Sequence, residues 1–204
     1  MHTKRSVFMS DSRELILNTA FRLFLEKSYH EVTMQDIVKA TGLSKGAFYH
    51  YFNSKEMVFE EIIEWFFKDI YQISFAGFSK NSLWEFCEDY LKMVAERVYK
   101  YANTDGVMRT NQYSLIFDAT KIFPQFRDKQ KRRQEIELQQ WTSVIAKARE
   151  SGEIASPLSD EQIAKLFIYQ NYGIGVYHVL RAQVDELLSE RRNQFKAIYE
   201  LLKK

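Results

Sequence analysis

Residues 33–59, TMQDIVKATGLSKGAFYHYFNSKEMVF, constrain the fold of this chain more than any other stretch. Thr33 and Asp36 form the [ST]-x-x-[DE] pattern that caps the start of a helix. Gly42 occurs where that helix has to end, because glycine adopts the left-handed backbone conformation without strain. Ser44 then provides the cap of a second helix. Two short helices joined across such a turn predict a helix-turn-helix unit.

The second helix has one apolar face and one face suited to nucleic acid. Phe48 and Phe52 recur at the i, i+4 spacing, so both are expected to point inward. The opposite face is small, polar and basic, and consists of Lys45, Gly46, Ala47, Tyr49 and His50. The DNA major groove admits one α-helix, small residues permit close approach, and Lys and His donate to phosphates or base edges.

Lys55 stands at the start of the next helix, which Ser54 is expected to cap. A cation in the first helical turn is poorly placed in the field of the helix dipole. A phosphate bound at the same helix start would explain it.

These motifs resemble the signature of the TetR family of bacterial transcriptional regulators. The matching segments are T-M-x-D-I, T-G-L-S-K-G-A-F-Y-H-Y-F and S-K-E-M, and the likeness covers roughly the first sixty residues. Val38 departs from the family, which usually has alanine where the two helices cross. The resemblance implies a homodimer that binds a palindromic operator, most often as a repressor that a small apolar or amphipathic effector releases. It implies these DNA-binding residues: Thr33, Ser44, Lys45, Gly46, Ala47, Tyr49, His50, Tyr51 and Lys55.

Composition predicts an all-α chain. Its 204 residues are 46% hydrophobic, with only two prolines and seven glycines, and alternating β-branched runs are missing. About nine helices are expected, with a three-helix head followed by a larger helical body. We expect residues 1–55 to form the DNA-binding domain and residues 56–204 the ligand-binding and dimerisation domain. Residues 1–55 hold eight Lys or Arg against five Asp or Glu, a modest excess that suits phosphate contact.

Several classes of protein have no support in the sequence. Cys87 is the only cysteine, which excludes an intrachain disulfide and favours the cytoplasm. No apolar run approaches the roughly 20 residues of a membrane span. Nucleotide-binding loops and metal-ligand spacings are missing, so no cofactor or metal is expected. A helical enzyme is the weakest alternative, and the basic run at residues 127–133 is read as a solvated face.

The last two helices, predicted at residues 159–182 and 185–202, carry apolar residues on more than one face. They form either the core of a monomer or, as the resemblance favours, a four-helix interface between two copies. The interface residues predicted on this basis are Tyr172, Gly173, Val176, Leu180, Leu187 and Phe195.

Phe, Trp and Tyr make up 15% of the chain, and many of them follow the head. Ordinary packing explains any one of them, whereas the resemblance favours an apolar effector pocket. The predicted wall contains Trp84, Phe86, Tyr90, Tyr113, Phe117, Trp141, Tyr169 and Tyr177, with Gln112, Gln140, Gln170, Asn171 and His178 as polar anchors. The alternative is a DNA-binding regulator without a small ligand, controlled by a protein partner.

Overall fold

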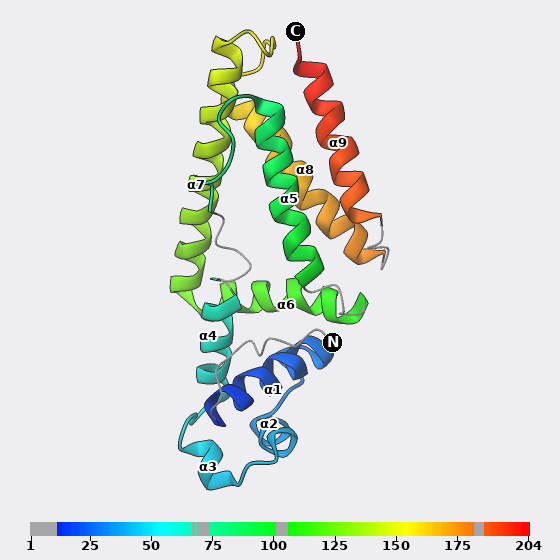
Figure 1. The fold of residues 1–204 in the computed structure, drawn as a ribbon. Helices are drawn as coiled ribbons and strands as arrows, with labels where there is room; N and C mark the ends of the chain where they lie inside the picture. The colour runs from blue at the N-terminus through cyan, green and yellow to red at the C-terminus, as the bar shows by residue number, and fades with distance from the viewer. Residues whose placement is uncertain (1–11, 67, 69–73, 101–105, 182–185) are drawn as a thin grey trace. The chain divides into compact units, whose positions relative to one another are not determined.

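The computed structural model describes residues 12–66, 68, 74–100, 106–181 and 186–204 (Figure 1). Within these residues the named elements are nine α-helices, which confirms the all-α prediction. They are α1 (Ser12–Lys27), α2 (Met34–Thr41), α3 (Lys45–Tyr49), α4 (Lys55–Phe66), α5 (Leu83–Lys100), α6 (Gly106–Ile122), α7 (Pro124–Glu150), α8 (Asp160–Leu180) and α9 (Leu187–Leu202).

Local signals in the sequence define many of these helix ends. Pro124 is the first residue of α7, where its missing N–H would have no intrahelical partner. The Ser159 hydroxyl accepts a hydrogen bond from Gln162 N at 3.2 Å, and the Gln162 side chain accepts one from Ser159 N at 2.9 Å. This reciprocal pair is a capping box at the start of α8.

Residues 107–122, which the sequence predicts as one or two short helices, form one helix, α6, which begins one residue earlier at Gly106. The helix that begins near Ser54 was expected to reach Phe75, but α4 ends at Phe66 and residues 74 and 75 are not helical. The predicted start of the last helix, Asp185, lies outside the described residues.

The chain packs as two compact units. The first contains residues 1–71 and 107–127, and the second contains residues 72–106 and 128–204. Helix α6 therefore packs with the head. The predicted functional boundary after residue 55 is a different division of the chain and stays a prediction.

The first unit has its core between α1, α2, α3, α4 and α6. Phe24, Phe48 and Phe59 are fully buried there, and Leu115 of α6 joins them. Phe59 also stacks on Tyr29, with ring centroids 4.1 Å apart. This core holds the helix-turn-helix on α1 and α4.

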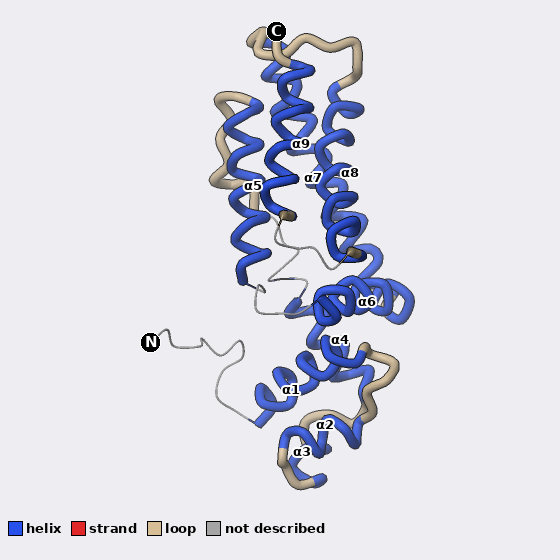
Figure 2. The backbone as a smooth tube through the Cα atoms, turned by 90° about the vertical axis from the view of Figure 1, so that its right-hand side faces the viewer, coloured by secondary structure: helices blue, strands red, loops and turns tan. Residues whose placement is uncertain are grey.

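In the second unit α5, α7, α8 and α9 lie side by side (Figures 1 and 2). Trp141 of α7 is completely buried at the centre of their core. Its ring stacks on Phe167 of α8 at 4.9 Å between centroids and meets Phe86 of α5 edge-on at 4.8 Å.

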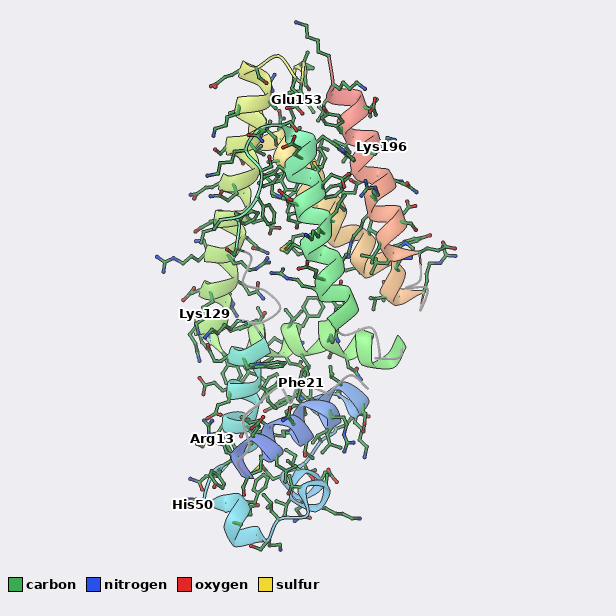
Figure 3. All side chains as sticks on the ribbon, in the orientation of Figure 1. Arg13, Phe21, His50, Lys129, Glu153 and Lys196 are labelled. Atoms are coloured by element: carbon green, nitrogen blue, oxygen red, sulfur yellow. The ribbon has the colours of Figure 1, made fainter. Side chains whose placement is uncertain are left out.

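Glu153, in the loop after α7, ties three helix ends of this unit together (Figure 3). Its carboxylate accepts hydrogen bonds from the backbone N–H of Leu83 at 3.0 and 2.9 Å, at the start of α5. It also accepts one from the Tyr199 hydroxyl of α9 at 3.0 Å. A carboxylate is well placed at a helix N-terminus, where it satisfies free N–H groups and the dipole.

Candidate functional site

The helix-turn-helix has the predicted caps and turn. Thr33 and Asp36 bond reciprocally at the start of α2, and the hydrogen bonds from Thr33 hold the pKa of Asp36 below its usual range. Gly42 ends α2 with φ of 69°, in the left-handed region. The Ser44 hydroxyl accepts from Ala47 N at 3.2 Å at the start of α3. Both cap hydroxyls thus order the turn that presents α3.

Helix α3 turns one side chain inward and the rest outward. Phe48 is fully buried, and Phe52 just beyond the helix is 1% exposed. The residues predicted to contact DNA from this helix and its end are exposed, namely Lys45, Gly46, Ala47, Tyr49 and His50. His50 is labelled at the end of α3 in Figure 3. The outward face is therefore small and basic and carries aromatic and imidazole rings.

Gly46 is not required by the packing of the protein itself. A Cβ added to Gly46 would meet no atom within 4 Å, and its φ is not in the positive range. Glycine inside a helix is less stable than alanine by about 1 kcal/mol. Neither packing nor backbone conformation among the described residues therefore requires a glycine at this position.

Two predicted DNA-contact residues are used differently. Tyr51 is half-buried and packs against the core of the first unit. The Lys55 ammonium donates to the backbone oxygens of Tyr29 and Val32, each at 2.9 Å. It also lies 4.2 Å from the centroid of the Tyr29 ring. These two backbone oxygens and the ring give the Lys55 cation partners within the protein, so its position at a helix start has an explanation without a phosphate, and its contact with DNA stays a prediction.

The last turn of α1 and the link that follows it also contact α6, which the sequence did not reveal. The imidazole of His30 lies 3.2 Å from the buried Asp118 carboxylate, and Asn111 donates to Leu25 O at 2.9 Å. These contacts join residues far apart in the chain, so no local motif predicts them.

The residues predicted to line one effector pocket do not have one common environment. Gln112, Tyr113 and Phe117 belong to α6 and to the first unit, where Phe117 is exposed. Phe86, Tyr90 and Trp141 pack against one another in the core of the second unit. For these six residues a role in a pocket wall stays a prediction.

Other predicted pocket residues line hollows on the second unit. Tyr169 lines a hollow of about 470 Å³ between α7 and α8. Gln170, Tyr177 and His178 line one of about 590 Å³ between α8 and α9. Trp84 lines a smaller hollow, of about 240 Å³, with residues of α9.

A buried polar network crosses α5, α7 and α8 of the second unit. Glu137, which is completely buried, accepts hydrogen bonds from the hydroxyls of Tyr90 at 2.7 Å and Tyr172 at 3.0 Å. Arg133 donates to Tyr172 Oη at 2.6 Å and to the Glu137 carboxylate at 3.4 Å. Asn171 Nδ2 donates to Tyr90 Oη at 3.1 Å. Arg133, predicted to lie on a solvated face, is therefore mostly buried and ion-paired.

Three of the six predicted interface residues are used within the protomer. Leu187 is 4% exposed and Phe195 is fully buried in the core, so the prediction that they face a second copy is wrong. Both lie on the inner face of α9, which the apolar pattern alone did not distinguish from its outer face. Tyr172 is half-buried and bonded to Glu137. Gly173, Val176 and Leu180 are exposed on α8.

The described residues contain no cluster of three or more His, Cys, Asp or Glu arranged to hold a metal ion. Over the same residues, no helix combines the length and apolar character needed to cross a membrane. Cys87 is buried, and burial raises the pKa of its thiol well above the ordinary value. A buried thiol of this kind is unreactive.

An all-helical chain with an exposed, capped recognition helix at its N-terminus defines the class of helix-turn-helix proteins. Residues 16–62 match the family model "Bacterial regulatory proteins, tetR family". The chain is 39% identical over 59 residues to YuxN, an HTH-type transcriptional regulator of Bacillus subtilis, and the match covers 29% of this chain and 20% of YuxN. IcaR of Staphylococcus aureus, an HTH-type negative transcriptional regulator of the biofilm operon icaADBC, is 26% identical over 115 residues. That match covers 52% of this chain and 62% of IcaR, so less than two thirds of either relative is spanned.

The fold extends this likeness beyond the head. The ketosteroid transcriptional regulator KstR2 of Mycobacterium tuberculosis superimposes with a TM-score of 0.61 at 16% identity. The superposition covers 98% of each chain, and at this identity it is a likeness of fold. Residues 16–62 therefore carry the match to the tetR family, and the fold of the whole chain is similar to that of TetR-family regulators.

Proposed function

We propose that this protein binds a palindromic DNA operator as a homodimer and represses transcription until a small effector releases it. The observation that carries the proposal is the outward face of α3, on a helix anchored by the buried Phe48. In this proposal residues 1–55 bind DNA, and residues 56–204 bind the ligand and form the dimer. The protein acts in the cytoplasm.

The recognition helix suggests how the DNA is read. Lys45, Gly46 and Ala47 stand at the exposed start of α3, the end that reaches base edges in helix-turn-helix complexes. Tyr49 and His50, also exposed, follow toward the end of the helix, where sugar and phosphate contacts are expected. The bare position at Gly46 suits a close approach to the DNA.

Repression is proposed on the analogy of IcaR, whose name describes a negative transcriptional regulator. A dimer is proposed because one short helix reads only a few base pairs. Two heads on a palindrome read twice as many, with half-site centres about 34–36 Å apart or a multiple of one turn. The exposed apolar residues of α8, among them Val176 and Leu180, supply a surface for the second copy.

An apolar or amphipathic effector is proposed for the second unit. Its hollows of about 470 and about 590 Å³ have the size of small-molecule sites. Aromatic and aliphatic side chains line them together with amide and charged groups, a mixture that suits an amphipathic ligand better than a purely apolar one. Release requires that the effector favour a conformation with lower DNA affinity. A tenfold loss of DNA affinity needs about 1.4 kcal/mol of preference between the two states.

Selection of bound fragments from a random DNA pool tests the DNA-binding part of this proposal. The expected product is a palindrome whose half-sites are about one helical turn apart, bound by two copies of the chain. Enrichment of no sequence over the starting pool would contradict it. A reporter gene placed behind the selected site then distinguishes repression from activation by the sign of the change.

Titration of a ligand found by thermal-shift screening, with and without saturating operator, tests release. Coupling between two binding sites is reciprocal, so operator DNA has to weaken ligand binding by the factor by which ligand weakens DNA binding. Ligand affinity that is unchanged by DNA would rule out release by that ligand.

A further inference from the structure

Helix α8 carries an exposed apolar line of side chains along one face. Leu166 is 44%, Tyr169 64%, Tyr177 54% and Leu180 76% exposed, with Gly173 exposed between them. Seven residues make nearly two helical turns and four slightly more than one. These five residues therefore lie within about 40° of a single line along the helix.

The residue types along this line are symmetric about Gly173. A tyrosine stands four residues before it and four after it, and a leucine stands seven residues before it and seven after it. A two-fold axis perpendicular to a helix reverses its direction. It brings the residue that precedes the axis on one copy to the residue that follows it on the other.

Gly173 leaves space at the centre of this line. A Cβ built on it would meet nothing within 4 Å, and its φ is not positive. Neither packing within the described protomer nor backbone conformation explains a glycine in the middle of α8. Close approach of a second helix explains it, because small residues allow two backbones to come together.

The surroundings of α8 fit such a partner. Its exposed line lies between two hollows, one beside Tyr169 and one beside Gly173 and Tyr177. On the α9 side, Gln170 bonds Gln194 at 3.1 Å. That contact holds α8 on α9, so the exposed line belongs to a fixed surface between the two hollows.

We propose that two copies of α8 pack antiparallel across a two-fold axis that passes between their Gly173 residues. Leu166 of each copy then contacts Leu180 of the other, and Tyr169 contacts Tyr177 of the other. This inference rests on the proposed homodimer and specifies its register. Exposed apolar side chains are removed from water in matching pairs, which is the driving force of the contact.

Cysteine cross-linking with a short bis-maleimide tests the register in a Cys87→Ala background. Leu166→Cys alone and Leu180→Cys alone should give no cross-linked dimer, because like positions are about 21 Å apart across the axis. An equimolar mixture of the two variants, refolded together, should cross-link efficiently. Gly173→Cys should cross-link to itself, since the axis brings like positions together there.

Leu201→Cys is the matched control, because Leu201 is 85% exposed and lies on α9, off the proposed line. Leu201→Cys should give no cross-linked dimer, either alone or mixed with Leu166→Cys or Leu180→Cys. Circular dichroism and sedimentation of each variant check that the fold and the dimer are kept. If Gly173→Cys prevents association, the mixture of Leu166→Cys and Leu180→Cys still tests the register, because both variants retain Gly173.

The outcomes separate the register from the dimer itself. A dimer in sedimentation whose mixture fails to cross-link, or whose Leu166→Cys variant cross-links alone, would overturn the register and leave the homodimer standing. A wild-type protein that is monomeric, free and on operator, would overturn the proposed homodimer and the register together. Cross-linking of the mixture, with each single variant inert, supports both.

Discussion

The Lys55 ammonium lies 2.9 Å from the backbone oxygen of Tyr29 and 4.2 Å from the centroid of its ring. This pair joins the start of α4 to the link that precedes α2. The Tyr29 hydroxyl in turn donates to Glu56 at 3.3 Å. Tyr29 is therefore held to α4 both through its backbone oxygen and through its side-chain hydroxyl. The first turn of α4 is thereby attached to the helix-turn-helix.

Replacing Lys55 with methionine should destabilise the first unit. The change keeps most of the apolar stem and removes two charge-assisted hydrogen bonds to carbonyl groups. We expect a loss of roughly 1–3 kcal/mol in the free energy of unfolding. Urea unfolding followed by circular dichroism measures it. Lys39→Met is the control, an exposed lysine of α2. Equal stability of the two variants would show that the carbonyl contacts contribute nothing.

Replacing Gly46 with alanine should move stability and DNA binding in opposite directions. The new methyl group meets no protein atom within 4 Å, and alanine favours the helix by up to about 1 kcal/mol. Thermal unfolding should therefore shift upward while affinity for the selected operator falls at least several-fold. Gly42→Ala is the contrast, because φ of 69° disfavours alanine and stability should fall. Operator affinity that is unchanged in Gly46→Ala would mean that the DNA does not approach this position.

The free energy of unfolding should fall at alkaline pH because of the half-buried phenol of Tyr172. Burial, and then the Glu137 carboxylate, raise the pKa of Tyr172 to about 12. An unfolded tyrosine loses its proton near pH 10, so between about pH 10 and about pH 12 the folded state binds more protons. This contribution is complete below about pH 10 and is lost as pH rises toward about 12. Tyr172→Phe should show a shallower loss in urea unfolding over this range, and a slope equal to that of the wild type would contradict the assignment.

Glu137→Gln should be strongly destabilising, because it leaves the mostly buried Arg133 without its counter-charge. Removing one partner of a buried ion pair typically costs about 3–5 kcal/mol. The double variant Arg133→Met with Glu137→Gln should recover part of that loss. Urea unfolding of the two single variants and the double variant measures the coupling energy. Losses that simply add would mean that the two charges do not interact.

The sequence predicted most reliably what local patterns control. The cap at Thr33, the turn at Gly42 and the inward Phe48 follow from short-range signals, and the structure has all three. The destination of a long polar side chain is not a local property. Nothing near Lys55 in the sequence indicates that its ammonium turns back to Tyr29 rather than toward a phosphate.

The body illustrates the same limit for apolar residues. Periodicity marked α8 and α9 as apolar, but it did not separate Phe195, buried within the protomer, from Leu180, which is exposed. That distinction depends on which neighbours cover each face. The aromatic content likewise did not indicate which rings pack on one another, such as Trp141, whose ring stacks on Phe167 in the core of the second unit.

Binding of the Lys45→Ala variant to operator and to random DNA tests the central claim most directly. Lys45 is exposed at the start of α3, and its ammonium is proposed to reach a base edge. The account predicts a loss of roughly 1–3 kcal/mol on the selected operator, relaxed preference at one position of each half-site, and a much smaller loss on random duplex. Equal losses on the two DNAs at every salt concentration would contradict a base-reading role for α3.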